Sequence, residues 1–255
     1  MRATLAVLRG ALADAVARRA SFAGQVAVMV VNDVALLAFW LIFFARVPSV
    51  RGWDVDAVLV LFAVLAVSGG LVLGVLSNSR RIPHLVTSGA LDETLTLPVD
   101  PLAHLLVRTT TAVNFGDVVF GVVLFAVRGH PTPQRVALFV FGVLAATAVM
   151  AAFFVASGSL VFFTDREEPG SLGMHAMLLL SFYPADVFDG ALRILLYTAV
   201  PAAFVGAVPA RVVEHPTWGQ AGLLLAVAVA SVVLARRVFT LGLRRYTSGS
   251  AWARG

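Results

Sequence analysis

The sequence contains no cysteine, and none of its 19 basic residues is a lysine. The absence of cysteine excludes disulfides, thiolate metal sites and thiol catalysis. The absence of lysine excludes a Walker A loop, because that loop reaches the nucleotide phosphates through a lysine. Any ATP hydrolysis linked to this protein must therefore take place on another chain.

Charge is also scarce. Only 13% of the 255 residues are charged and 60% are hydrophobic, whereas about a quarter of the residues of an ordinary globular protein are charged. Several apolar runs exceed the roughly 20 residues that cross a bilayer as a helix. The net charge of +5 comes from arginines that flank these runs and do not cluster with aromatic residues, so a membrane explains it better than nucleic acid. We predict an all-α polytopic membrane protein.

Motifs of catalysis and metal binding are missing as well. No GxSxG nucleophile motif occurs, and no acidic pair is placed for hydrolytic work. The histidines show neither HxxxH nor HExxH spacing, so they make a poor metal site. These are His84, His104, His130, His175 and His215. We predict no catalytic residue, no metal site and no enzyme activity on this chain.

The apolar runs divide a transmembrane domain over residues 22–245 into six spans. A basic, helically spaced segment at 1–21 precedes it and is predicted to lie in the membrane interface, although an ordinary basic leader is the alternative. A tail follows at 246–255. The fifth span is broken by proline and charged residues, and a re-entrant or interfacial helix is expected from about residue 191. The predicted spans are 22–45, 57–76, 110–127, 136–164, 172–183 with a few residues beyond, and 218–239.

The arginines predict the orientation. Six spans with both termini in the cytoplasm place 13 of the 19 arginines inside, which is the asymmetry that the positive-inside rule expects. Seven spans would move the arginine-rich tail outside. The loop at 77–108 then faces the cytoplasm. All-arginine basicity with much alanine and valine points to a bacterial source, and hence to the bacterial inner membrane.

The loop beginning at residue 77 is the most polar internal stretch of the chain. From Ile82 its pattern predicts a short helix that ends at Gly89, a residue suited to the C′ position. A second segment with apolar spacing follows, and Pro98 and Pro101 break it. We interpret this loop as lying against a soluble partner. A solvated connector between two membrane helices is the alternative.

Polar residues inside the predicted spans are candidate functional residues, because burying them in a membrane is costly. Asn32 and Asp33 lie midway along the first span, and Asn114 and Asp117 lie three apart on one face of the third. They would line a polar translocation pathway, or form ordinary hydrogen bonds between helices.

A local ion pair is also predicted on the outer side, in the broken fifth region. Asp189 and Arg193 stand at i, i+4, with Asp186 nearby. The expected role of this group is to hold a broken helix end near the membrane interface. A substrate gate is the second interpretation.

One stretch carries a family resemblance. Residues 88–101 read Ser-Gly-Ala-Leu-Asp-Glu-Thr-Leu-Thr-Leu-Pro-Val-Asp-Pro. This is similar to a run of glycine, an apolar–acidic pair, leucine and L-x-P with a second proline. Tyr183-Pro184, followed by Pro201 and Pro209, is a second likeness. With the six-span layout, the chain resembles the membrane subunit of a type-2 ABC exporter, in the six-span permeases encoded apart from their ATPase.

The resemblance implies roles for particular segments and partners. Residues 1–21 would be the elbow helix, and about 80–88 a coupling helix that docks on the ATPase. A second permease chain, identical or paralogous, and two ATPase copies would complete the assembly, with ATP and Mg on the ATPases and no cofactor on this chain. The implied ATPase-coupling residues are Arg80, Arg81, His84, Gly89, Asp92, Glu93 and Pro98.

Two rival functions fit the composition. A proton-coupled secondary transporter would use Asp33 or Asp117, and inverted repeats would support it, but the two halves show no convincing similarity. A membrane anchor would use the polar loop to recruit a soluble enzyme.

Overall fold

The structure, a computed structural model, describes residues 19–246. Most of the predicted interfacial helix at 1–21 and nearly all of the tail at 246–255 therefore lie outside the described residues. Within 19–246 the regular structure is helical, apart from one isolated bridge between Val50 and Trp53. The all-α prediction is confirmed. The α-helices are α2 (Arg19–Arg46), α3 (Val55–Gly74), α4 (Ile82–Thr87), α5 (Leu91–Leu95), α6 (Pro101–Val107), α7 (Phe115–Arg128), α8 (Pro133–Gly158), α9 (Val161–Thr164), α10 (Glu168–Ser181), α11 (Gly190–Tyr197), α12 (Ala207–Glu214) and α13 (Trp218–Leu243).

The helices contain four to six candidate membrane spans. Four segments of the described chain are long and apolar enough by themselves: Val28–Arg46, Val55–Gly74, Pro133–Thr164 and Trp218–Leu243. The count rises to six if two bent pairs each form one span. One pair joins α6 to α7 with a bend of 76°, and the other joins α11 to α12 with a bend of 57°. The chain is thus a polytopic membrane protein.

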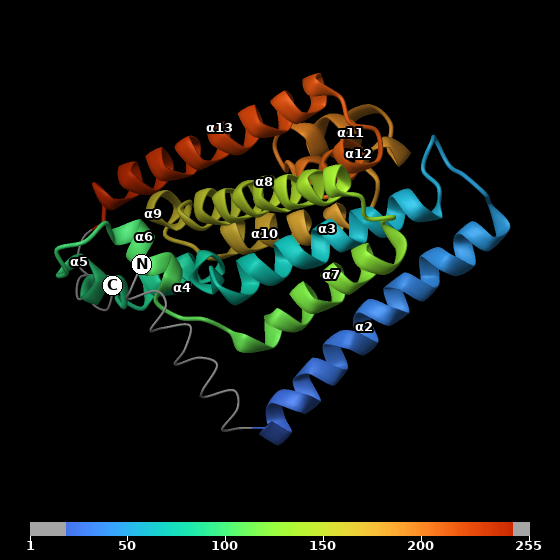
Figure 1. Cartoon of the computed structure of the whole chain (residues 1–255). Coiled ribbons are helices and arrows are strands. Elements are labelled where there is room, and N and C mark those ends of the chain that lie inside the picture. The colour runs from blue at the N-terminus through green and yellow to red at the C-terminus, as the bar shows by residue number, and fades with distance from the viewer. Residues whose placement is uncertain (1–18, 247–255) are drawn as a thin grey trace.

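The direction of the helices shows how the chain passes through the bundle. In Figure 1, α2, α7 and α10 run one way, while α3, α8 and α13 run back. Both α11 and α12 lie at the end where α13 begins, which matches the predicted re-entrant segment. The fifth passage is α10, whose 14 residues span about 21 Å at 1.5 Å per residue. That is shorter than a hydrocarbon core of about 30 Å.

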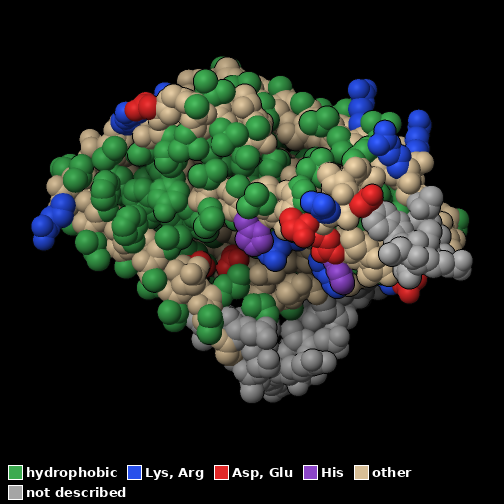
Figure 2. All heavy atoms as spheres, turned by 180° about the vertical axis from the view of Figure 1, so that it is seen from behind, with side chains coloured by type: hydrophobic (Ala, Val, Ile, Leu, Met, Phe, Trp, Pro, Cys, Tyr) green, Lys and Arg blue, Asp and Glu red, His purple; other side chains and the backbone are tan. Residues whose placement is uncertain are grey.

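The two ends of the bundle differ in composition. We call the end that carries α4, α5, α6 and α9 the loop end, and the end that carries α11 and α12 the hairpin end (Figure 1). From behind, apolar side chains cover the middle of the molecule and charged side chains gather toward the ends (Figure 2). Apart from Arg19, the first residue of α2, the described arginines that the orientation argument assigned to the cytoplasm belong to segments of the loop end. They are Arg80, Arg81, Arg108, Arg166, Arg236, Arg237, Arg244 and Arg245.

Helix α3 is the centre of the core. In its membrane segment 83% of the residues are buried, against 6% for the segment of α2. Helices α7, α8 and α12 pack on α3, and α13 and α10 pack on α8. Helix α2 contacts α7 and α3 along only part of its length and leans away from the bundle (Figure 1). Most of its apolar surface is therefore left for lipid or for another chain.

Two glycines allow α3 and α7 to approach closely. A Cβ atom on Gly70 of α3 would lie 2.7 Å from the Asn114 carbonyl oxygen and from Val118 Cγ2. A Cβ atom on Gly121 of α7 would lie 2.7 Å from the Ala63 carbonyl oxygen. Small residues at such crossings let membrane helices gain van der Waals contact where no hydrophobic effect drives association.

We predict that Gly70→Val and Gly121→Val each lower the thermal stability of the purified protein. Overpacking of this kind typically costs about 1–3 kcal/mol, because the new side chain meets backbone atoms of the facing helix. The measurement is the melting temperature in detergent. Gly69→Ala is the matched control, since a Cβ atom at the adjacent Gly69 meets nothing within 4 Å. Equal melting temperatures for Gly70→Val and Gly69→Ala would contradict the proposed close contact.

Candidate functional site

A tight turn organises the hairpin end. Val50 and Trp53 exchange two backbone hydrogen bonds of 2.9 Å, and the two residues between them, Arg51 and Gly52, have φ of 49° and 78°. Positive φ at both central positions is the mark of a type I′ turn. Glycine adopts this conformation freely, but arginine does not. Surrounding contacts must hold Arg51 in place.

The side chain of Arg51 supplies those contacts. Its guanidinium donates to both carboxylate oxygens of Asp189, at 2.6 and 2.5 Å, and to the Asp186 carbonyl oxygen at 3.1 Å. The bidentate pair lowers the pKa of Asp189, through hydrogen bonding first and charge second. Its stabilisation is therefore present above the ordinary pKa of aspartate and is lost as pH falls through the lowered value. This contact ties the α2–α3 loop to the start of α11.

Asp186 is the centre of the same network. Its carboxylate accepts from the Trp53 indole nitrogen at 3.1 Å and from Arg193 at 3.1 Å. Arg211 of α12 lies 3.8 Å from it and stacks over the Trp53 ring at 4.1 Å. The predicted local ion pair does form, but Arg193 pairs with Asp186, and the expected partner Asp189 binds Arg51 instead. Asp189 is the N-cap of α11 with extended backbone, so the i, i+4 geometry of a helix does not apply to it.

The loop at the other end is built from short helices. Helix α4 ends at Thr87, and Gly89 follows with φ of 76°, which confirms the predicted C′ glycine. Helix α5 ends before Pro98, as expected. Pro101 differs from the expectation: it is the first residue of α6, where a proline is well tolerated. The side chain of Asp100 caps this helix by accepting from the Ala103 N–H at 2.9 Å.

A second small core anchors this loop to the bundle. Ile82 and Val86 of α4 and Leu91 of α5 are buried with Phe162 and Phe239. The last two belong to α9 and α13. Further contacts are hydrogen bonds at the sides of the loop: Asn78 donates to the Leu105 carbonyl oxygen at 2.7 Å, Thr109 donates to Asn78 at 2.7 Å, and Thr87 donates to Glu167. The loop is therefore packed on the helices and does not hang in solvent.

The predicted coupling residues lie on the outer side of the anchored loop. Arg80, Arg81, His84, Glu93 and Pro98 are exposed, and Gly89 and Asp92 are partly exposed. Glu93 forms an ion pair with Arg108 at 2.5 Å, and His84 lies 3.9 Å from Glu167. Neither Arg80 nor Arg81 forms an ion pair within residues 19–246.

Sequence reasoning missed three apolar residues of the same surface. The exposed fractions of Leu95, Leu97 and Val99 are 40%, 43% and 49%. Leu95 is the last residue of α5 and the other two follow it, at an end of the molecule that is otherwise rich in charge. Exposed apolar side chains rimmed by charged ones are typical of protein contact surfaces. We call residues 80–99 the coupling surface. The position of Leu97 directly before Pro98 was visible in the sequence, but its exposure was not.

The polar residues of the predicted spans divide into two groups. Asn114 caps α7 and donates to the Leu73 carbonyl oxygen at 2.7 Å, so it forms an ordinary hydrogen bond between helices. Asp33 of α2 and Asp117 of α7 lie together at one cavity, and Asn32 precedes Asp33 on α2. Asn32 itself is exposed on α2.

The aspartate pair borders a partly open cavity of about 80 Å³. Apolar residues of α3, α7, α8 and α10 form the other walls, including Phe62, Phe120 and Met150. The two carboxyl groups are the polar part of its lining. No group of three or more metal-ligating side chains occurs among the described residues.

Comparison with known proteins decides the family. A family model described as "ABC-2 family transporter protein" matches residues 30–250. The chain belongs to the ABC-2 transporter family. It is a membrane-spanning permease subunit of a type-2 ABC transporter, and the family implies a partner ATPase. No curated protein and no solved structure matches the chain.

We expect Asp186→Asn to destabilise this permease more than Asp189→Asn. Asp186 is the common partner of Trp53, Arg193 and Arg211, and losing charged hydrogen bonds of this kind costs about 1.5–3 kcal/mol. Asp189 is exposed and serves mainly Arg51. The measurement is the melting temperature of the two variants beside wild type at neutral pH. A larger loss for Asp189→Asn would contradict the central role of Asp186.

Proposed function

We propose that this chain forms half of the translocation pathway of an ATP-driven exporter and couples it to a separate ATPase. The observation that carries the proposal is the coupling surface, where Arg80 and Arg81, which form no ion pair within residues 19–246, lie with exposed leucines on a loop packed against the bundle. In the proposed orientation this loop and both termini face the cytoplasm of a bacterial cell. The membrane is the bacterial inner membrane.

The second core gives the coupling surface a mechanical connection to the bundle. Ile82 and Val86 pack against residues that belong to α8, α9 and α13, including Val155 and Phe239. A Cβ atom on Gly158 would lie 3.1 Å from Ile82 Cβ, so α4 and the end of α8 are in close contact. Packed interfaces of this kind move as rigid units. When the ATPase moves α4, we propose, α8 and α13 tilt with it.

The remaining partners follow from the open face of α2. Only 6% of the membrane segment of α2 is buried, and the Asp33–Asp117 pair lies where α2 approaches α7. We propose that a second permease chain, identical or paralogous, faces this side. The polar pathway would then run between the two chains past Asn32, Asp33, Asn114 and Asp117. Two ATPase copies would hold ATP and Mg, and this chain would hold no cofactor.

A proton-coupled transporter is the second candidate, because the carboxyl groups of Asp33 and Asp117 meet at one cavity inside the membrane region. The family match supports the ATP-driven function over it. A membrane anchor that recruits a soluble enzyme uses the same coupling surface. The two experiments below separate these functions.

Arg80→Glu is expected to abolish co-purification of the ATPase from membranes, because it reverses the charge of an exposed arginine in the coupling surface. Leu97→Asp is expected to have the same effect by placing a carboxylate in the apolar part of that surface. The measurement is recovery of an ATP-hydrolysing chain with the tagged permease in mild detergent. Arg46→Glu is the matched control: it makes the same charge reversal on an exposed arginine at the hairpin end.

Each outcome of this experiment has a meaning. If the ATPase no longer co-purifies with Arg80→Glu and Leu97→Asp but still co-purifies with Arg46→Glu, the result supports ATPase coupling through residues 80–99. Recovery of another enzyme in place of an ATPase supports the anchor. Full recovery of the ATPase with both variants overturns the assigned coupling surface.

The proton-coupled alternative predicts flux without an ATPase. We expect liposomes that contain the purified permease alone, under an imposed pH gradient, to take up protons no faster than empty liposomes. The measurement uses an enclosed pH-sensitive dye. Proton flux that Asp117→Asn abolishes would instead favour the secondary transporter, since this substitution removes one of the two carboxyl groups.

A further inference from the structure

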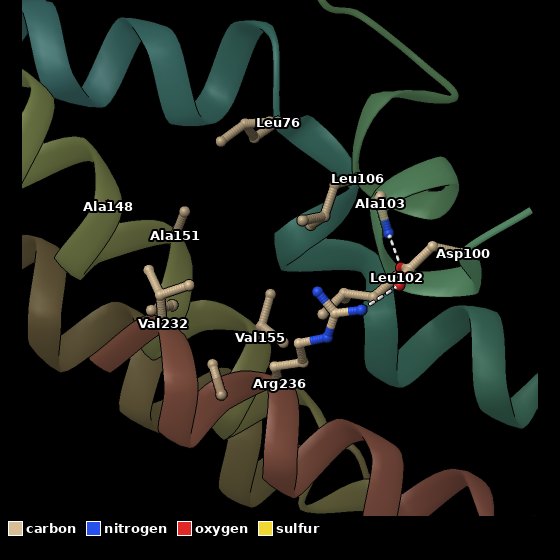
Figure 3. A pocket seen from close by; sticks show the side chains of 12 residues that line it. Leu76, Asp100, Leu102, Ala103, Leu106, Ala148, Ala151, Val155, Val232 and Arg236 are labelled. Carbon is tan, nitrogen blue, oxygen red and sulfur yellow. Dashed lines mark hydrogen bonds and ion pairs between the residues drawn. The ribbon is translucent and has the colours of Figure 1, made fainter. Parts of the chain in front are cut away.

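An apolar groove opens between α6, α8 and α13 at the loop end (Figure 3). Its volume is about 270 Å³. Alanines of α8 and α13 form its floor and so leave it deep, whereas Leu76, Leu102 and Leu106 line the opposite side. In Figure 3 the side chains of Leu76, Leu106 and Val155 point toward the open space. The groove is smaller than a typical drug-sized ligand site, but its shape and lining suit part of a hydrocarbon chain.

Charged groups close one side of this groove. Arg236 of α13 donates to the Asp100 carboxylate at 2.5 Å, and the other oxygen of Asp100 caps α6 (Figure 3). The pair is exposed, with 68% of the Arg236 side chain and 40% of the Asp100 side chain accessible. An exposed pair of this kind is weak, so a stronger anion can share Arg236 with Asp100.

A second, open depression adjoins the groove through Arg236. Arg237, Thr240 and Arg244 line it together with Val233 and Leu241. These residues stand three and four apart on the last turns of α13, so their side chains share one face. Neither Arg237 nor Arg244 forms an ion pair within residues 19–246. Among the described residues that line the groove and the depression, Asp100 is the one acid beside three clustered guanidinium groups.

The two features meet where an anionic phospholipid would place its parts. We propose that the loop end binds one anionic phospholipid, with an acyl chain in the groove and the phosphate between Arg236, Arg237 and Arg244. The hydroxyl of Thr240 offers a further hydrogen-bond donor there. Basic pockets between membrane helices bind anionic headgroups in this way. Zwitterionic lipids would fit the groove but would not offset the arginine charge.

The test is a lipid titration of the purified full-length permease in detergent, with its ATPase if it co-purifies. Phosphatidylglycerol and phosphatidylcholine of identical chains are added separately, and binding is measured by native mass spectrometry and by the shift in melting temperature. We expect wild type to bind phosphatidylglycerol with a defined stoichiometry and to bind phosphatidylcholine at least tenfold more weakly. Equal binding of the two lipids would overturn the proposal.

Arg237→Gln/Arg244→Gln tests the headgroup contact. The double variant is expected to bind phosphatidylglycerol roughly 25-fold more weakly, since each basic residue contributes about fivefold near an anionic lipid surface. The control Arg80→Gln/Arg81→Gln removes the same charge from the same end and is expected to bind like wild type. Equal losses in the two variants would mean that only overall charge matters, which would also overturn the proposed site.

Filling the groove tests the acyl contact. Ala148→Phe places a large side chain on the half-exposed groove wall and is expected to weaken phosphatidylglycerol binding. Ala148→Leu is a milder version, used if the first variant lowers the melting temperature without lipid. Glycerol phosphate, a headgroup without acyl chains, is expected to leave the melting temperature unchanged. Unchanged phosphatidylglycerol binding by both groove variants, or a shift with glycerol phosphate alone, would overturn the acyl-chain site.

Discussion

The hydrocarbon interior accepts almost no unpaired polar group, and the arrangement of this permease follows from that constraint. The ion pairs of the described residues lie at the two ends, such as Arg51–Asp189 at one and Arg236–Asp100 at the other. The middle is left to apolar helices around α3. There, close contact between helices depends on small residues such as Gly70 and Gly121. Moving apolar side chains from lipid into a helix contact gives little hydrophobic free energy, so van der Waals packing must hold the helices together.

The two ends use their charges for different purposes. At the hairpin end, the hydrogen bonds of Arg51, Asp186 and Trp53 are made within the fold. They hold the bent pair α11–α12 beside the short helix α10. At the loop end, Arg80 and Arg81 have no acid to bind in the described chain. The hairpin end therefore pairs most of its charged side chains internally, with Arg46 as an exposed exception, whereas Arg80 and Arg81 at the loop end lie near exposed apolar side chains. This asymmetry is what supports a partner at the loop end.

Rules based on residue spacing predicted the helix end at Gly89 correctly. They failed at residues that lie outside regular helices. Gly89 was predicted to end a helix and does so, because its positive φ is set by the neighbouring turn. The Asp189–Arg193 pair was wrong because Asp189 lies outside the helix, and its partner Arg51 is 138 residues away. Pro101 was expected only to break a segment, and it begins α6. The meeting of Asp33 with Asp117 also required two helices to be placed in space.

The sequence by itself determined the helical membrane class, the positions of the apolar runs, the absence of a nucleotide-binding lysine and the short helix before Gly89. These depend on composition and near-neighbour spacing, which act along the chain. Tertiary structure alone decided that Leu97 is exposed, that Ile82 is buried beneath α8 and α13, and that a groove opens beside Arg236. Exposure and cavities depend on which distant helices pack together, and no spacing rule within one segment specifies that packing.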